Sequence, residues 1–119
     1  MPWEIEFTEE FEEWFETLSD AERADVVATV DFLEIRGTNL GHPQSSGISS
    51  SRHPHMRELR IQHRGRPYRV LYAFNPVRTA ILLLGGDKTG DDRWYEKNVP
   101  IADDLYDVHL EELRKEGLI

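Results

Sequence analysis

The sequence predicts an α+β domain in which a small antiparallel β-sheet meander packs against an N-terminal helical hairpin, in the order β-α-α-β-β-β-α. Two patterns predict this fold. Residues 56–84 contain three short segments rich in β-forming residues with turn sequences between them, which is typical of consecutive antiparallel strands. Residues 9–37 contain two segments whose apolar residues recur at helical spacing. At 119 residues the chain suits one hydrophobic core, so we expect a single domain over residues 1–119.

The N-terminal elements are predicted from alternation and capping patterns. A short strand is expected first, because apolar residues alternate with polar residues or proline at Trp3, Ile5 and Phe7. Thr8 is placed to cap a first helix. Ser19 and Glu22 form the pattern of a capping box, which predicts the start of a second helix, and Gly37 predicts its end. Two helices joined so closely are expected to form an antiparallel pair.

The rest of the chain is predicted as a loop, the meander and a last helix. Residues 41–54 are rich in glycine, serine and proline, and we expect a long surface loop there. Strands are expected at 56–62, 68–74 and 79–84, and the last of them is apolar throughout, as in a central strand. Gly85 and Gly86 are interpreted as a loosened strand end, followed by a turn without helical periodicity. A final helix is expected at about 100–116, with Pro100 in its first turn and Gly117 after its end.

Composition excludes several classes of function. The chain has no cysteine, which excludes disulfides, a thiol nucleophile and thiolate metal sites. Its first residues are acidic and lack the apolar segment of a secretory signal. No apolar run approaches the roughly 20 residues of a membrane span. We therefore expect a cytoplasmic protein without a membrane partner.

The charges are unevenly distributed along the chain. The net charge is −9, which taken alone argues against a nucleic-acid partner. Residues 1–35 carry twelve acidic side chains and one basic one, whereas residues 36–94 carry ten basic and four acidic ones. Residues 95–119 are again acidic. This basic middle segment permits an anionic ligand without requiring one.

Six arginines and three histidines lie between Arg52 and Arg69, and Glu58 is the single acidic residue among them. An arginine inside an apolar strand, as at Arg69, is costly unless its guanidinium reaches a partner or an anion. Arg60 lies on the more polar face of its strand, so the two side chains could hold one phosphate. Alternatively, Arg69 pairs with Glu58. For Arg57, Arg64 and Arg66, solvation or pairing with the acidic segments is the favoured interpretation.

The stretch "GGDKTG" does not match a phosphate-binding P-loop, because the spacing of its glycines is wrong and no periodic helix follows. Lys88 then lies just beyond the last strand, where it joins Arg60 and Arg69 around one anion or is merely solvated. His53 and His55 lack a third donor for a metal site, so we expect no metal there. As loop histidines they could serve proton transfer.

The predicted element order and the stretches "MRELR", "GRPYRVLYAF" and "ILLLGGDKTG" followed by "WY" resemble the RelE/ParE toxin superfamily over nearly the whole chain. Within it the chain is similar to the HigB-like branch related to phage Gp49. The resemblance implies the toxin of a type II toxin–antitoxin pair, a ribosome-dependent mRNA endonuclease that needs no metal or other cofactor. Such enzymes activate a ribose 2′-OH to attack the adjacent phosphate, which leaves a 2′,3′-cyclic phosphate and a 5′-OH.

The resemblance also implies roles for particular residues. Arg60 and Arg69 would clamp the phosphate, Lys88 would stabilise the transition state or assist proton transfer, and Tyr95 would stack on a base or help with the proton. His55 is a further catalytic candidate, and the RNA-binding candidates are Arg57, Arg64 and Arg66. The implied partners are a helix-turn-helix, HigA-like antitoxin, the ribosome and mRNA, with DNA contacted only through the antitoxin.

Two non-enzymatic functions remain as alternatives. One is a ParE-like gyrase poison, and the other is a degenerate member that binds an antitoxin-like partner through its acidic segments. The family usually has a basic surface, whereas this chain is acidic and surrounds Lys88 with Asp87, Asp91 and Asp92. The nuclease requires Arg60, Arg69, Lys88 and Tyr95 to surround one cavity. An Arg69 locked to Glu58 would favour the binding functions.

Overall fold

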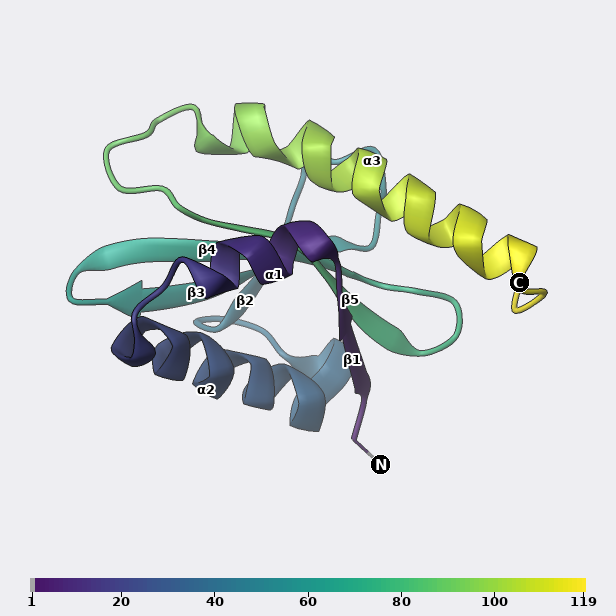
Figure 1. The fold of residues 1–119 in the computed structure, drawn as a ribbon, viewed down its shortest axis with the longest axis horizontal. Helices are drawn as coiled ribbons and strands as arrows, with labels where there is room; N and C mark the ends of the chain where they lie inside the picture. The colour runs from purple at the N-terminus through teal and green to yellow at the C-terminus, as the bar shows by residue number, and fades with distance from the viewer. Residues whose placement is uncertain (1) are drawn as a thin grey trace.

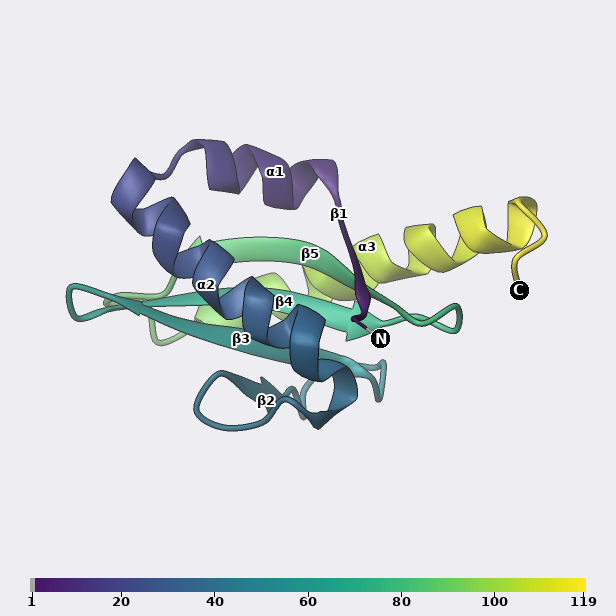
Figure 2. The same cartoon turned by 90° about the horizontal axis from the view of Figure 1, so that it is seen from below.

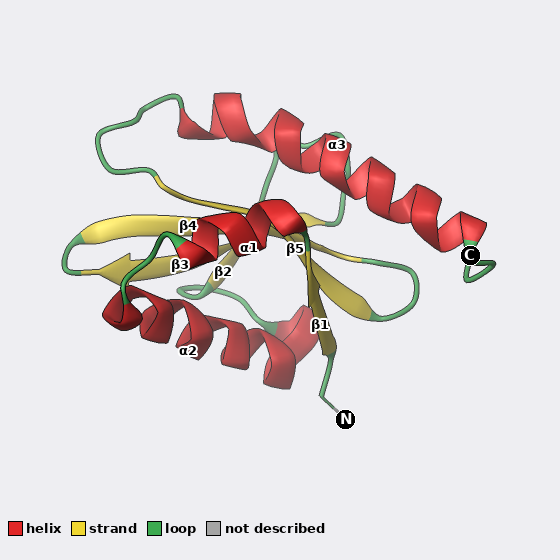
Figure 3. Ribbon diagram, viewed as in Figure 1, coloured by secondary structure: helices red, strands yellow, loops and turns green. Residues whose placement is uncertain are grey.

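A five-stranded mixed sheet with helices on both faces forms the α+β fold, as the computed structural model of residues 2–119 shows (Figures 1 and 3). The strand order is β1-β5-β4-β3-β2, in which β1 runs parallel to β5 and all other neighbours are antiparallel. The predicted meander is therefore confirmed as β3-β4-β5. In chain order the elements are β1 (Glu4–Phe7), α1 (Glu9–Glu16), α2 (Asp20–Arg36), the 3-10 turn η1 (Gly37–Asn39), β2 (Ser45–Gly47), β3 (Met56–His63), β4 (Arg66–Phe74), β5 (Thr79–Asp87) and α3 (Trp94–Lys115).

The sheet separates two hydrophobic cores. α1 packs mainly on β5 and α2 on β3, on one face of the sheet, while α3 covers the other face (Figures 1 and 2). Neighbouring residues of β4 supply the two cores alternately, with Val70 and Tyr72 on the side of α1 and α2 and Leu71 and Ala73 on the side of α3. β5, with neighbours at both edges and helices on both faces, is the central strand that its apolar sequence predicted.

The predicted helix boundaries at the N-terminal hairpin are confirmed. The hydroxyl of Thr8 accepts a hydrogen bond from the backbone N–H of Phe11 at 3.1 Å and caps α1. Ser19 and Glu22 make both hydrogen bonds of the capping box, at 2.8 and 3.2 Å. α2 ends at Gly37, whose φ of 54° suits glycine. The two helices diverge onto different strands, so each is stabilised mainly by the sheet.

Two predicted boundaries are wrong. The segment 41–54 is not all loop, because β2 pairs with β3 and forms an edge of the sheet. α3 begins at Trp94 and contains Pro100, whereas the sequence placed its start at the proline. Burial of Trp94 and Val99 against the sheet stabilises these additional turns. Although α3 has 22 residues, neither it nor another helix within residues 2–119 is apolar over a run long enough to cross a membrane.

The sequence suggested that the paired glycines of β5 loosen the end of the strand, and this prediction is wrong. The strand continues through them to Asp87, which pairs with Tyr68 of β4. A Cβ atom on Gly85 would lie 2.1 Å from the ring of Trp14 on α1, and one on Gly86 would lie 2.8 Å from the indole nitrogen of Trp94 on α3. The glycines therefore allow two tryptophans to close onto the strand from the two faces of the sheet.

Candidate active site

Two arginines on neighbouring strands form the centre of the candidate site. Arg60 of β3 and Arg69 of β4 are direct cross-strand partners, so their side chains leave the sheet on the same face, the one that α3 covers. The Arg69 side chain is 6% exposed, whereas the Arg60 side chain is 36% exposed. The sheet register thus brings together the two guanidinium groups that the sequence placed at one phosphate, with Arg60 nearer to solvent.

A buried carboxylate lies between these arginines. One oxygen of Glu58 lies 3.3 Å from Arg69 Nε, and the other lies 3.3 Å from Arg60 Nη1. The same carboxylate accepts hydrogen bonds from the hydroxyls of Ser46 at 2.6 Å and of Tyr95 at 2.5 Å. The pairing of Arg69 with Glu58, which the sequence left as an alternative, is confirmed. Buried charges need such partners, and here each guanidinium has one.

Tyr95, at the start of α3, connects the helix to this charged group. Its hydroxyl donates to Glu58 and accepts a 3.2 Å hydrogen bond from Arg69 Nε. Burial and the hydrogen bond to Glu58 raise the pKa of the Tyr95 hydroxyl, and Arg69 offsets part of this rise. The phenol is therefore neutral near pH 7 and carries a proton that it can donate.

Lys88 lies in the segment that follows β5, close to Tyr95. Its ammonium lies 5.5 Å from the centre of the Tyr95 ring, and its backbone N–H donates to Pro67 at 3.0 Å. Two of the flanking aspartates have other partners, since Asp87 pairs with Arg66 at 2.7 Å and Asp91 with Lys97 at 2.7 Å. Across residues 2–119, no carboxylate oxygen lies within 4.0 Å of the Lys88 ammonium. We call Glu58, Arg60, Arg69, Lys88 and Tyr95 the arginine cluster.

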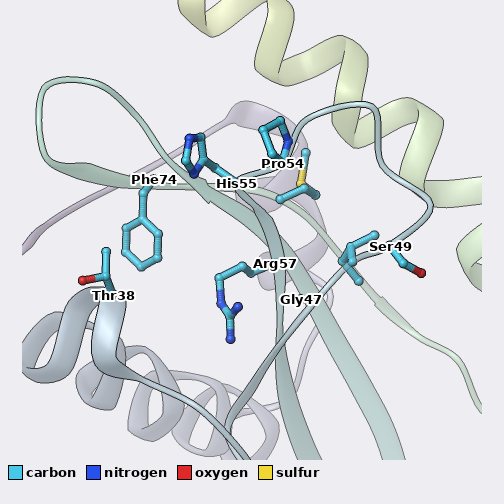
Figure 4. A pocket seen from close by; sticks show the side chains of 9 residues that line it. Thr38, Gly47, Ser49, Pro54, His55, Arg57 and Phe74 are labelled. Atoms are coloured by element: carbon cyan, nitrogen blue, oxygen red, sulfur yellow. The ribbon is translucent and has the colours of Figure 1, made fainter.

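A hollow of about 380 Å³ opens beside the arginine cluster. It is lined by Glu58 and Tyr95 and by the segment 47–50, which begins at the last residue of β2. A larger hollow of about 530 Å³, shown in Figure 4, shares Gly47, Ile48 and Ser49 with the smaller one. Of the four residues that the nuclease was expected to need around one cavity, Tyr95 lines the smaller hollow, whereas Arg60, Arg69 and Lys88 do not. Substrate access to Glu58 and Tyr95 is expected through this hollow.

His55 and Arg57 line the larger hollow and not the smaller one (Figure 4). Arg57 alternates with Glu58 along β3 and points to the opposite face of the sheet. There it donates to the Ser45 hydroxyl at 3.1 Å and to the Leu40 carbonyl at 3.4 Å. Neither residue joins the arginine cluster, so neither gains support as a catalytic or RNA-binding residue from this geometry.

The other arginine candidates lie along the β3–β4 hairpin. Arg64 is in its turn with a φ of 51°, and Arg66 is paired with Asp87 beside the ring of Tyr68. Arg52 and His53 instead reach α3, where both contact Asp107. The part of Arg64 and Arg66 in RNA binding stays a prediction. Within residues 2–119, no three or more histidine, aspartate or glutamate side chains are grouped as ligands for one metal ion.

Sequence reasoning underestimated Glu58, which contacts Ser46, Arg60, Arg69 and Tyr95 at once. Its position two residues before Arg60 placed both on one face of a strand and was the available signal. Ser46 gave no such signal, because its strand was predicted as a loop. Chemically, the arginine cluster offers two guanidinium groups and an ammonium for a phosphate, a carboxylate that can take a proton and a phenol that can give one.

Comparison with known proteins identifies relatives along most of the chain. The family described as phage-derived protein Gp49-like (DUF891) matches residues 13–107. The candidate toxin HigB3 of Mycobacterium tuberculosis is 46% identical over 93 residues, which are 77% of this chain and 80% of that protein. The candidate toxin HigB2 of the same organism is 40% identical over 87 residues, which are 71% of this chain and 43% of that protein. The chain thus spans less than half of HigB2.

Solved structures share the fold at low sequence identity. A chain of the RelBE2 toxin–antitoxin complex from M. tuberculosis matches with a TM-score of 0.55 at 18% identity. The match covers 73% of this chain and 99% of that chain. A mutant of the Escherichia coli toxin RelE has a TM-score of 0.57 at 12% identity, with 81% and 94% covered. The archaeal RelE–RelB complex from Pyrococcus horikoshii has a TM-score of 0.56 at 15% identity, with 76% and 99% covered. The chain therefore belongs to the Gp49-like, HigB-related family, and its fold is that of the RelE toxins.

Proposed function

We propose that this chain is the toxin of a type II toxin–antitoxin pair and acts as a ribosome-dependent endoribonuclease on mRNA. The observation that carries the proposal is that Arg60, Arg69 and Tyr95 all contact the Glu58 carboxylate, with the Lys88 ammonium beside the Tyr95 ring and an open hollow lined by Glu58 and Tyr95. The relatives named as candidate toxins support the same function.

In the proposed reaction, Arg60 and Arg69 bind the phosphate and stabilise the charge that develops on it in the transition state. The Glu58 carboxylate takes the proton of the ribose 2′-OH, whose oxygen forms a bond to phosphorus. The bond from phosphorus to the 5′-oxygen breaks, and this oxygen takes a proton from Tyr95. The 2.5 Å hydrogen bond between Tyr95 and Glu58 gives a direct path for the proton on Glu58 to return to the phenol. The products are a 2′,3′-cyclic phosphate and a free 5′-OH.

The acidity of the chain supports ribosome dependence. With a net charge of −9, attraction to free RNA is weak, because phosphate contacts by basic residues dominate such binding. A ribosome that holds the mRNA in place supplies the proximity that the surface charge does not. We therefore propose that free RNA is cleaved much more slowly than mRNA on translating ribosomes.

One observation favours a non-enzymatic toxin, such as a ParE-like gyrase poison. Arg69 is locked to Glu58 in a pair that is 6% exposed on both sides, so this guanidinium already has an anion. In that alternative the pair is structural, and growth inhibition comes from docking. The two functions differ in whether RNA ends appear.

Mapping mRNA 5′ ends in translating extracts separates these functions. The chain, Arg69→Ala, Lys88→Ala and the matched control Arg114→Ala are compared, since Arg114 makes only an exposed ion pair with Glu111. New 5′-OH ends with the native chain and Arg114→Ala, but not with Arg69→Ala, support the nuclease. Growth arrest without new 5′ ends contradicts it and supports the docking toxin.

We propose a helix-turn-helix antitoxin as the partner, and the cytoplasm as the location. A groove of about 290 Å³ between α1, α2 and β1 is lined almost wholly by apolar side chains, among them Phe7, Phe11 and Val27. Glu12 lies in the lining of the groove, and α1 carries further exposed acids at Glu9 and Glu10. A partner segment with apolar anchors and flanking basic residues complements this surface in shape and charge.

A further inference from the structure

The hollow of about 380 Å³ contains recognition chemistry that the proposed reaction does not use. We propose that it binds the nucleobase next to the cleaved phosphate, so that the segment 47–50 sets the nucleotide preference. This inference rests on the proposed function and adds the substrate group that the hollow selects.

The position of the hollow fixes which part of an RNA can enter it. Glu58 and Tyr95 belong both to its wall and to the arginine cluster. A phosphate held by Arg60 and Arg69 is therefore one side chain away from the hollow. The nearest group of the RNA beyond ribose and phosphate is a base, which is the group that can reach the segment 47–50.

The lining offers the contacts by which proteins recognise single-stranded bases. The Tyr95 ring provides an aromatic surface for stacking, and Ile48 provides an apolar one. The hydroxyls of Ser49 and Ser50 are exposed and, within residues 2–119, make no hydrogen bond to another protein group. Each can both donate to and accept from a base edge. A volume near the lower end of the roughly 300–1,000 Å³ of small-ligand sites is large enough for a base.

The wall that carries these serines is held at both ends. On one side Gly47 pairs with Arg57 in the sheet, and the Ile48 N–H donates to the Met56 carbonyl at 3.2 Å. On the other side the Ser51 hydroxyl donates to Asp103 of α3 at 2.5 Å. Asp103 is 4% exposed and also accepts from the backbone N–H of Arg52 at 3.3 Å.

A surface that discriminates between nucleobases requires such anchoring. Groups fixed before binding discriminate between ligands better than groups on a mobile loop, because little ordering is left to be done on binding. The ion pairs of Arg52 with Asp104, at 3.0 Å, and with Asp107 add to the attachment of the segment to α3. Ser49 and Ser50 are thus held between two anchored ends, in the lining of the hollow that also contains Tyr95.

Binding of small nucleotides tests the inference without requiring cleavage. Backbone amide signals of the native chain are followed by NMR while inorganic phosphate or one of the four nucleoside 3′-monophosphates is added. We expect phosphate to shift the signals around Arg60 and Arg69, and the nucleotides to shift residues 47–50 as well, one of them most tightly. Ser49→Ala combined with Ser50→Ala should reduce the spread of affinities among the four nucleotides by about 5-fold, the loss expected for one or two hydrogen bonds.

Thr38→Ala is the matched control, because Thr38 lines the larger hollow instead. It should leave the nucleotide preference unchanged. Shifts at 47–50 that are equal for all four nucleotides, or a preference that the serine variant keeps, overturn the inference even when mRNA cleavage is found. If the chain cleaves no mRNA but shows nucleotide-specific shifts at 47–50, the inference about base binding is supported. In that case only the proposed nuclease activity is contradicted.

Discussion

Arg60 and Arg69 face each other directly across β3 and β4, so that two positive charges occupy one position of the sheet. Like charges placed opposite each other destabilise a strand pair. Here Glu58, two residues before Arg60 on the same face, contacts both guanidinium groups at 3.3 Å. The carboxylate therefore makes the arginine pair compatible with folding, and the site that would hold a phosphate is also a structural unit of the sheet.

Glu58→Gln should lower the free energy of unfolding by about 3 kcal/mol, because it leaves the buried Arg69 without its anion beside a second guanidinium. Urea denaturation of the native chain and the variant measures this. The matched control is Glu111→Gln, which removes an exposed pair with Arg114 and should cost less than about 0.5 kcal/mol. Equal costs for the two variants would show that Glu58 does not hold the arginines.

Gly85→Ala should destabilise the chain strongly, because its Cβ would lie 2.1 Å from the Trp14 ring and the tryptophan would have to leave its place on β5. Displacing a packed side chain of this size typically costs several kcal/mol, and we expect at least about 2 kcal/mol. Thermal unfolding followed by tryptophan fluorescence measures the change.

Two further variants test the explanation of the Gly85→Ala effect. Gly41→Ala is the control, since within residues 2–119 no atom beyond its two chain neighbours lies within 4 Å of the position of its Cβ. Gly85→Ala combined with Trp14→Leu should lose less stability than the two single changes added together, because the smaller side chain removes the collision. Simple additivity would mean that the close approach of Trp14 does not explain the glycine.

The sequence predicted the elements whose patterns are local. Caps at Thr8 and Ser19 and the apolar run of β5 depend on neighbouring residues, and they were confirmed. β2 was missed because a three-residue edge strand of serines and glycine is stabilised by pairing with β3 and not by its own propensity. The start of α3 was missed for a similar reason, since Trp94 is held by packing on Gly86, a contact that no periodicity reveals.

The candidate site was predictable in part. Strand alternation placed Glu58 and Arg60 on one face of their strand, and the register of β3 with β4 adds Arg69 to the same face, as the prediction of a shared phosphate required. The position of Tyr95 beside them depended on where α3 begins and how it crosses the sheet, which are tertiary features. His55 could not be assigned from the sequence, because it precedes β3 and lines the larger hollow, whereas Glu58 and Tyr95 of the arginine cluster line the smaller one.

Val27→Asp should weaken binding of the antitoxin while leaving toxicity intact. Val27 lines the apolar groove of α1, α2 and β1, and it is 47% exposed, so the change costs little stability. A charge in an apolar contact that binding buries should lower affinity by at least about 10-fold. Coexpression of toxin and antitoxin, with growth as the readout, measures neutralisation. The control Val108→Asp alters a similarly exposed valine on α3, outside this groove, and should stay neutralised. Full neutralisation of Val27→Asp would place the antitoxin elsewhere.

Stability should fall at both ends of the pH range because of one hydrogen bond, from the Tyr68 hydroxyl to the Glu22 carboxylate. This bond, with those from Ser19, lowers the pKa of Glu22 from 4.5 to about 2, so its stabilisation is complete above pH 4.5 and is lost as the pH falls through about 2. Burial and the bond to Glu22 raise the pKa of Tyr68 from 10.0 to about 12, so that contribution is complete below pH 10 and is lost as the pH rises through about 12.

Melting temperatures measured across these ranges should fall at both ends. Glu22→Gln, which keeps the cap of α2, should flatten the acid side, and Tyr68→Phe should flatten the alkaline side. An acid side unchanged by Glu22→Gln would assign the loss of stability to other carboxylates.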